Sequence, residues 1–163
     1  MGKSTHPLWA PWRGEFIHSR KSGVCFLCGN EQPAENKPEE ELIVTRMRHC
    51  FIMLNRYPYN CGHLLVVPYR HTGDLSALEK EELHELMDGC VAAKEALLKA
   101  MAPDAFNIGF NLGAAAGAGV AEHLHLHIVP RWNGDTNFMS VISSTRVIPE
   151  TLARTAELLR AFF

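Results

Sequence analysis

The sequence predicts one compact domain that combines strands with helices, and three observations lead to this prediction. The chain has 163 residues, enough to bury a sizeable core within a single domain. Short apolar runs with the character of strands lie on both sides of one long segment with a helical period. Residues 121–132, AEHLHLHIVPRW, alternate histidine with aliphatic side chains, as expected of a strand whose two faces have different roles.

Three strands are expected before the long helix, and a loop rich in turn residues separates the second from the third. Their apolar runs are residues 42–45, 50–54 and 63–68. Asn55 stands at the start of this loop and His63 at its end. Because the two residues bracket one loop, both side chains could contact the same ligand.

Residues 74–101 are predicted to form the main helix. Ser76 and Glu79 match a capping box at its start, and the apolar side chains that follow recur with a period of about 3.6 residues. This apolar stripe is expected to face the core. The other expected elements are strands at 106–112 and 138–143, the histidine-bearing strand within 121–132, and an amphipathic helix at 149–163.

Four consecutive parts are expected within this single domain. They are an N-terminal arm at 1–22, a CxxC knuckle and loop at 23–41, a core at 42–132 and a C-terminal extension at 133–163. The arm is rich in Trp, Pro and Arg and has no helical or strand period. Two interpretations of it stay open: it packs against the body or a second subunit, or it is a partly ordered terminus.

Composition excludes several classes of function. The net charge of −2 provides no basic field for bulk nucleic acid, although a local pocket for one nucleotide is compatible with it. The sequence has no apolar run of membrane-spanning length and no signal pattern at its start, so we expect a cytoplasmic protein that does not bind membranes. Five cysteines, an odd number without a secretory context, argue against a disulfide framework.

The histidine triplet is the feature with the strongest functional meaning. His123, His125 and His127 would share one strand face, and a proline at 130 is expected to end the strand. Imidazoles two residues apart on a strand are about 7 Å from one another. Three of them together cost desolvation and charge repulsion without a structural return. Two interpretations follow: a metal cluster, or a histidine nucleophile flanked by helpers.

As a nucleophile, a neutral imidazole can attack phosphorus and form a readily cleaved phosphoramidate, which divides one displacement into two easier steps. The attacking nitrogen must be unprotonated, so the other ring N–H needs an acceptor, and a backbone carbonyl of the glycine-rich segment could serve. Charge develops on the phosphoryl oxygens, and His63, His127 and backbone N–H groups of the glycine-rich segment 113–120 are candidate donors to them.

As metal ligands, histidines would be joined by the thiols of Cys25 and Cys28, whose CxxC spacing lets both reach one ion. A redox role for this motif would need a strand-to-helix context that is missing here. Together with His71 and His123, the two cysteines could form a closed, structural zinc site. The other two histidines of the triplet would then be free for catalysis, so both interpretations can hold together.

The residues HLHLHIVPR resemble the signature of the histidine triad (HIT) family, and the similarity extends to NRYPYNCGHLLVVP and the helix after it, over about residues 40–132. The flanks LWAPWR and PRWNGDTNF resemble the bacterial diadenosine tetraphosphate phosphorylase branch of that family. The resemblance implies an α+β fold, with an antiparallel sheet of about five strands, one long helix and a C-terminal helix, paired as a homodimer.

The resemblance also implies cleavage of a dinucleoside polyphosphate at an α-phosphate through a nucleotidyl-histidine intermediate. His125 would be the nucleophile, and His127 and His63 would contact the α-phosphate or assist the leaving group. Asn55 would lie near the ribose and Asn111 near the phosphates. Residues that would line the acceptor space are Gly117, Ala118 and Gly119, and those that would bind a structural zinc are Cys25, Cys28, His71 and His123. No cofactor is required for the chemistry.

One departure from the family pattern concerns the second acceptor. Many hydrolases of the family carry a glutamine shortly before the triad, whereas this chain reads AGVAE at 118–122. Its absence favours a phosphorylase that uses inorganic phosphate to release ADP. The alternatives are a hydrolase of dinucleoside polyphosphates or nucleoside phosphoramidates and, from another class, a nucleotide-binding protein with little catalysis.

Overall fold

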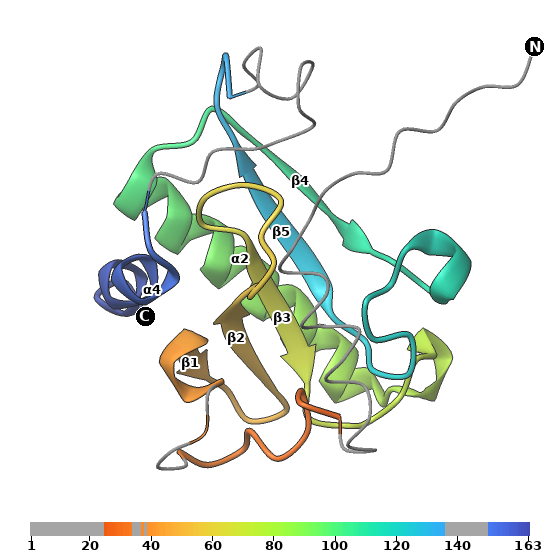
Figure 1. Ribbon diagram of the computed structural model, residues 1–163. Coiled ribbons are helices and arrows are strands. Elements are labelled where there is room, and N and C mark those ends of the chain that lie inside the picture. The colour runs from red at the N-terminus through yellow and green to blue at the C-terminus, as the bar shows by residue number, and fades with distance from the viewer. Residues whose placement is uncertain (1–24, 34–36, 38, 136–149) are drawn as a thin grey trace, which may run out of the picture.

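The computed structural model describes residues 25–33, 37, 39–135 and 150–163 (Figure 1). Five antiparallel strands form one open sheet in the order β1-β2-β3-β5-β4. The strands are β1 (Ile43–Arg46), β2 (Cys50–Leu54), β3 (Leu64–Pro68), β4 (Ala105–Phe110) and β5 (Leu126–Arg131), and the helices are α2 (Lys80–Met101) and α4 (Leu152–Arg160). The predicted α+β fold, with a five-stranded antiparallel sheet, a long helix and a C-terminal helix, is confirmed.

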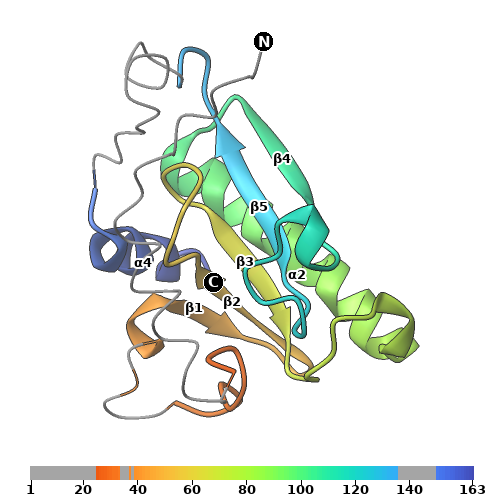
Figure 2. The ribbon, with the colours of Figure 1, turned by 45° about the vertical axis from the view of Figure 1, so that its right-hand side comes forward.

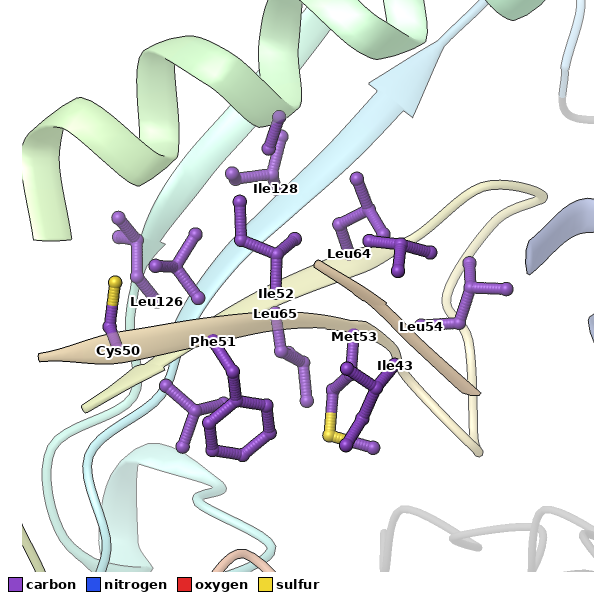
Figure 3. Packing of buried hydrophobic residues seen from close by; sticks show 14 of the residues in the cluster. Ile43, Cys50, Phe51, Ile52, Met53, Leu54, Leu64, Leu65, Leu126 and Ile128 are labelled. Carbon is purple, nitrogen blue, oxygen red and sulfur yellow. The ribbon is translucent and has the colours of Figure 1, made fainter. Parts of the chain in front are cut away.

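Both faces of the sheet are buried at its centre (Figure 3). The side chains that point toward α2 include Ile52, Leu64, Leu126 and Ile128, and those on the opposite side include Phe51, Met53 and Leu65. The helix α2 packs mainly against the three inner strands β2, β3 and β5. Burial on two faces explains why β2 and β3 are continuous apolar runs in the sequence and do not alternate.

The start of the main helix differs from the prediction. A short 3-10 helix, η3 (Leu75–Ala77), comes first, and the Asp74 carboxylate caps it by accepting the Ser76 N–H at 2.9 Å. The capping box of α2 is formed by Glu79 and Glu82, so the predicted pair of Ser76 and Glu79 is wrong. The reason is local: Asp74 already engages Ser76, whereas the Glu82 carboxylate reaches the Glu79 N–H at 2.8 Å.

The histidine strand is also placed differently from the prediction. β5 begins at Leu126, so His123 and His125 lie in the segment just before it. Pro130 does not end the strand, which continues beyond it. β3 pairs with β5 only as far as Ile128, so at Pro130 the strand has a partner on the β4 side alone. A proline is tolerated at such an edge-like position.

The C-terminal helix α4 packs beside β1 and η2 (Glu40–Leu42) and buries Ala156 and Leu159. Near its end, the guanidinium of Arg160 donates to the backbone carbonyls of Ile43 (3.0 Å), Glu40 (3.2 Å) and Glu41 (2.7 Å). These bonds satisfy carbonyl groups around η2 and fix α4 against the first strand.

Two predicted segments, the arm at 1–22 and the strand at 138–143, lie outside the described residues. Within the part of the chain that the structure describes, neither α2 nor any other helix combines the length and apolar character that crossing a membrane demands.

Candidate active site and metal centre

Four side chains that could bind a metal meet at the end of β3, and they come from three segments that are far apart in the sequence. Their donor atoms, on Cys25, Cys28, His71 and His123, all lie within 4.8 Å of one another. Cys28 Sγ is 3.2 Å from His71 Nδ1 and 3.5 Å from His123 Nδ1, and the two Nδ1 atoms are 3.3 Å apart. The structure therefore brings together the four predicted metal ligands.

These separations fit a tetrahedral zinc ion. With metal–sulfur and metal–nitrogen bonds of about 2.3 and 2.0 Å, tetrahedral donors stand roughly 3.3–3.8 Å apart. His123 Nε2 lies 2.8 Å from the Pro68 carbonyl, so it carries the ring proton and leaves Nδ1 free for the metal. Burial and the charge of Cys25 raise the pKa of Cys28 to about 11, which means that a cation is needed to hold the thiolate at neutral pH.

The segment before β5 is held against the chain that leaves β3. The Leu124 N–H donates to the Thr72 carbonyl at 2.7 Å. At Gly73 the two segments approach so closely that a Cβ atom would lie 2.3 Å from the Ala121 carbonyl oxygen. Any side chain at Gly73 would push the two segments apart, and with them His71 and His123. Glycine is required here for close approach.

The surroundings of His125 are compatible with its predicted role as a nucleophile. It is buried, and its Nδ1 lies 2.8 Å from the carbonyl oxygen of His123, two residues earlier. The carbonyl can only accept, so the proton resides on Nδ1 and the lone pair on Nε2 is available. The predicted acceptor was a carbonyl of the glycine-rich segment, whereas the structure supplies that of His123.

A chain of hydrogen bonds also fixes the tautomers of His63 and His127. His63 Nδ1 accepts the backbone N–H of Tyr59 at 3.0 Å, so the proton of His63 resides on Nε2. His63 Nε2 lies 2.9 Å from His127 Nδ1 and donates to it. The neutral His127 ring therefore carries its proton on Nε2. That N–H is a donor suited to a phosphoryl oxygen beside His125.

The surroundings keep these histidines neutral. Burial, with smaller contributions from His127 and His125, lowers the pKa of His63 to about 3. Burial, followed by the charge of His125, lowers the pKa of His127 to about 4. Burial also lowers the pKa of His125. All three rings are uncharged at neutral pH, which preserves both the lone pair of the nucleophile and the hydrogen-bond chain.

The other predicted site residues lie around the triad. The amide nitrogen of Asn55 is 3.4 Å from His63 Nδ1, and that of Asn111 is 3.4 Å from His127 Nε2. Because His127 Nε2 carries a proton, the Asn111 amide would have to turn its oxygen toward the ring to form a hydrogen bond there. Gly109 pairs with His127 across β4 and β5, and a Cβ atom there would meet nothing within 4 Å, so space remains beside the ring. Gly117, Ala118 and Gly119 lie in the connection from η4 (Ala114–Ala116) to the triad (Figure 2), and their role stays a prediction.

Sequence reasoning assigns no role to several groups that hold this site. They are the carbonyls of Pro68 and His123, the Tyr59 N–H and the close approach at Gly73. Three of the four are backbone groups, which nearly every residue carries, so the sequence cannot indicate which of them form these contacts. The glycine after His71 is the one signal that could have indicated a tight contact.

Comparison with known proteins defines the family. A family model described as HIT domain matches residues 36–134. The AP-4-A phosphorylase of Mycobacterium tuberculosis is 41% identical over 158 residues, covering 93% of this chain and 81% of that protein. The chain therefore belongs to the HIT family, and the resemblance drawn from its motifs is confirmed. Membership of this family, together with that relative, makes it an enzyme.

Two further relatives bear on the chemistry. The bis(5'-nucleosyl)-tetraphosphatase (asymmetrical) of Schizosaccharomyces pombe is 34% identical over 91 residues, which cover 56% of this chain and 48% of that protein. The crystal structure of a zinc-bound histidine triad family protein from Mycobacterium smegmatis superposes with a TM-score of 0.61 at 31% identity, covering 74% of this chain and 81% of that one.

The low pKa values of His63 and His127 predict that acid destabilises the fold. Between about pH 6.5 and pH 4, His63 and His127 bind protons in the unfolded chain but stay neutral in the folded chain. The unfolding free energy therefore falls as pH falls. His63→Gln should reduce the slope by up to about 1.4 kcal/mol per pH unit. Denaturant titrations of both proteins across this range measure it, and identical slopes would contradict the assignment.

Proposed function

We propose that this chain cleaves diadenosine tetraphosphate or a related dinucleoside polyphosphate at an α-phosphate, through a nucleotidyl intermediate on His125. The observation that carries this proposal is the bond from His125 Nδ1 to the His123 carbonyl, which leaves Nε2 unprotonated and buried beside a donor, His127. The relative named AP-4-A phosphorylase supports the choice of substrate.

The reaction has two steps. His125 Nε2 forms a bond to the α-phosphorus as the bond from that phosphorus to the bridging oxygen breaks, and ATP leaves. An oxygen of inorganic phosphate then attacks the same phosphorus, the bond to His125 breaks, and ADP is released. In both steps the Nε2–H of His127 donates to a phosphoryl oxygen on which charge develops. His63 acts by holding that proton on Nε2.

Inorganic phosphate is the proposed acceptor because of what precedes the triad. The sequence AGVAE at 118–122 offers no glutamine to orient a water molecule, and the small residues around its start, Gly117, Ala118 and Gly119, leave room for an anion. The alternative is hydrolysis, of a dinucleoside polyphosphate or a nucleoside phosphoramidate, and the likeness to a tetraphosphatase favours the first of these. A nucleotide-binding protein with little catalysis is the candidate from another class.

Product analysis separates these functions. Incubated with diadenosine tetraphosphate and phosphate, the protein should release ADP and ATP in equal amounts, with little turnover when phosphate is omitted. AMP as a product, with or without phosphate, would establish a hydrolase. No turnover, and no adenylyl group on the protein by mass spectrometry, would establish the binding protein.

His125→Ala should lower turnover by at least about a thousandfold, because the covalent route is lost. The matched control is His84→Ala, an exposed histidine on α2, which should leave turnover unchanged. Both variants should unfold at the same temperature as the wild type. Near-normal activity of His125→Ala would refute the nucleotidyl-histidine mechanism.

We also propose that Cys25, Cys28, His71 and His123 hold a structural zinc ion. Two thiols and two imidazoles are a donor set that zinc prefers, and four protein ligands leave no open position for a reacting group. The ion would join the segment around Cys25 to the end of β3 and to the start of the triad, and it takes no part in the phosphoryl transfer.

Metal analysis should find about one zinc per chain. The double variant Cys25→Ser and Cys28→Ser should lose it and unfold at a lower temperature, because binding energy of a structural site is folding energy. Cys61→Ser, at a cysteine outside the cluster, should keep the metal. Zinc retained at full occupancy in the double variant would assign the metal to the three histidines instead.

We further propose that the chain forms a homodimer through β4. This strand is an edge of the sheet, and its Ile108 side chain is 46% exposed. Phe106, Ile108 and Phe110 share one face of the strand, and α2 packs mainly on the strands further in. A second copy paired along this edge would satisfy its free backbone groups and cover the apolar face.

Ile108→Glu should convert the dimer to a monomer, because a carboxylate would be buried against the partner. Sedimentation velocity at about 10 µM measures the change. Leu158→Glu, at a similarly exposed position on α4, is the control and should stay dimeric. A monomeric wild-type protein would contradict the proposal.

A further inference from the structure

Tyr59 lies in the loop between β2 and β3 with its side chain 45% exposed, next to the two helper histidines. Its ring is nearly parallel to that of His127, with 5.7 Å between centroids and 17° between planes. It also contacts the His63 ring at 4.8 Å and 34°. An aromatic side chain in a polar loop is thus packed against imidazoles, not against the apolar core.

The orientation of the His127 ring needs such a contact. The side-chain torsion that turns an imidazole about its bond to the chain is broad, so neighbours must set the plane of the ring. If the ring turned over about that bond, Nδ1 and Cδ2 would exchange places, a carbon would face His63, and the 2.9 Å bond from His63 would be lost. His63 and His125 meet His127 at tilted angles of 41° and 64°, so neither lies flat against it. Tyr59 does.

We propose that Tyr59 is a positioning residue that holds the His127 ring so that its Nε2–H faces the phosphoryl group during transfer. The kinetic part of this inference rests on the proposed function. The structural part, the tautomer and orientation of His127, does not depend on the substrate. The aromatic face performs the role, so Phe should replace Tyr, whereas an aliphatic side chain of similar volume should not.

The direct test is the ¹⁵N NMR spectrum of the histidine rings in the zinc-loaded, full-length protein. In the wild type and in Tyr59→Phe, His127 should show a single form with its proton on Nε2. In Tyr59→Leu, the His127 signals should become a mixture of tautomers or broaden through ring exchange. A single, unchanged form of His127 in Tyr59→Leu would overturn the proposal.

The kinetic test uses the same variants with diadenosine tetraphosphate. An aromatic stack of this kind shifts an equilibrium by about two- to tenfold. Tyr59→Leu should therefore lower kcat by that factor with KM nearly unchanged, and Tyr59→Phe should restore it. Loss of kcat in Tyr59→Phe equal to that in Tyr59→Leu would refute the role of the ring face. If the wild type turns over no dinucleotide, the proposed function fails while the NMR result still decides the role of Tyr59.

Tyr69 provides a matched control. Its ring stacks on Phe51 with nearly the same geometry, 5.6 Å between centroids and 18° between planes, and not on the His127 ring. Tyr69→Leu should lower the unfolding temperature and leave the His127 signals as in the wild type. If Tyr69→Leu changed the His127 signals as much as Tyr59→Leu does, loss of any aromatic stack would have this effect, and the proposal would be refuted.

Discussion

The site depends on the three-way attachment of His123. Its Nδ1 faces the two thiols and His71, its Nε2 bonds to the Pro68 carbonyl, and its own carbonyl accepts the Nδ1–H of His125. One residue therefore connects the candidate metal cluster, the end of β3 and His125, the proposed nucleophile. Because these bonds share a rigid backbone segment, a displacement of any one of them moves the acceptor that sets the tautomer of His125.

Burial suits this arrangement to the proposed phosphoryl transfer. The histidines would each lose reactivity if protonated, and the buried sheet centre disfavours the charged form of the imidazoles. Fixed backbone acceptors and donors then decide which nitrogen carries each proton, without a carboxylate in the chain of bonds. The proposed zinc ion, the Gly73 contact and the Leu124 bond to Thr72 would together hold the segment that carries His125, the proposed nucleophile.

The sheet and helices follow closely from local patterns. β2 coincides with its predicted range, and the bounds of the other strands differ from the predicted ones by a few residues. The agreement is close because apolar runs indicate strands and turn residues indicate where strands end. Two predictions, the start of the main helix and the end of the histidine strand, were wrong because contacts with other residues override the local sequence pattern. Asp74 engages Ser76 and delays α2, and Pro130 is tolerated because β3 has already ended beside it. Neither fact can be read from a propensity or a motif.

The sequence by itself determined the four residues of the candidate metal cluster, the spacing of the triad and the placement of Asn55 and His63 at the two ends of one loop, since these depend on residue type and on position along the chain. Only the tertiary structure decided which nitrogen of each ring is free and which group holds it there. The deciding partners are carbonyls of Pro68 and His123 and the N–H of Tyr59. Every residue except proline carries both of these backbone groups, so only their position in space distinguishes them.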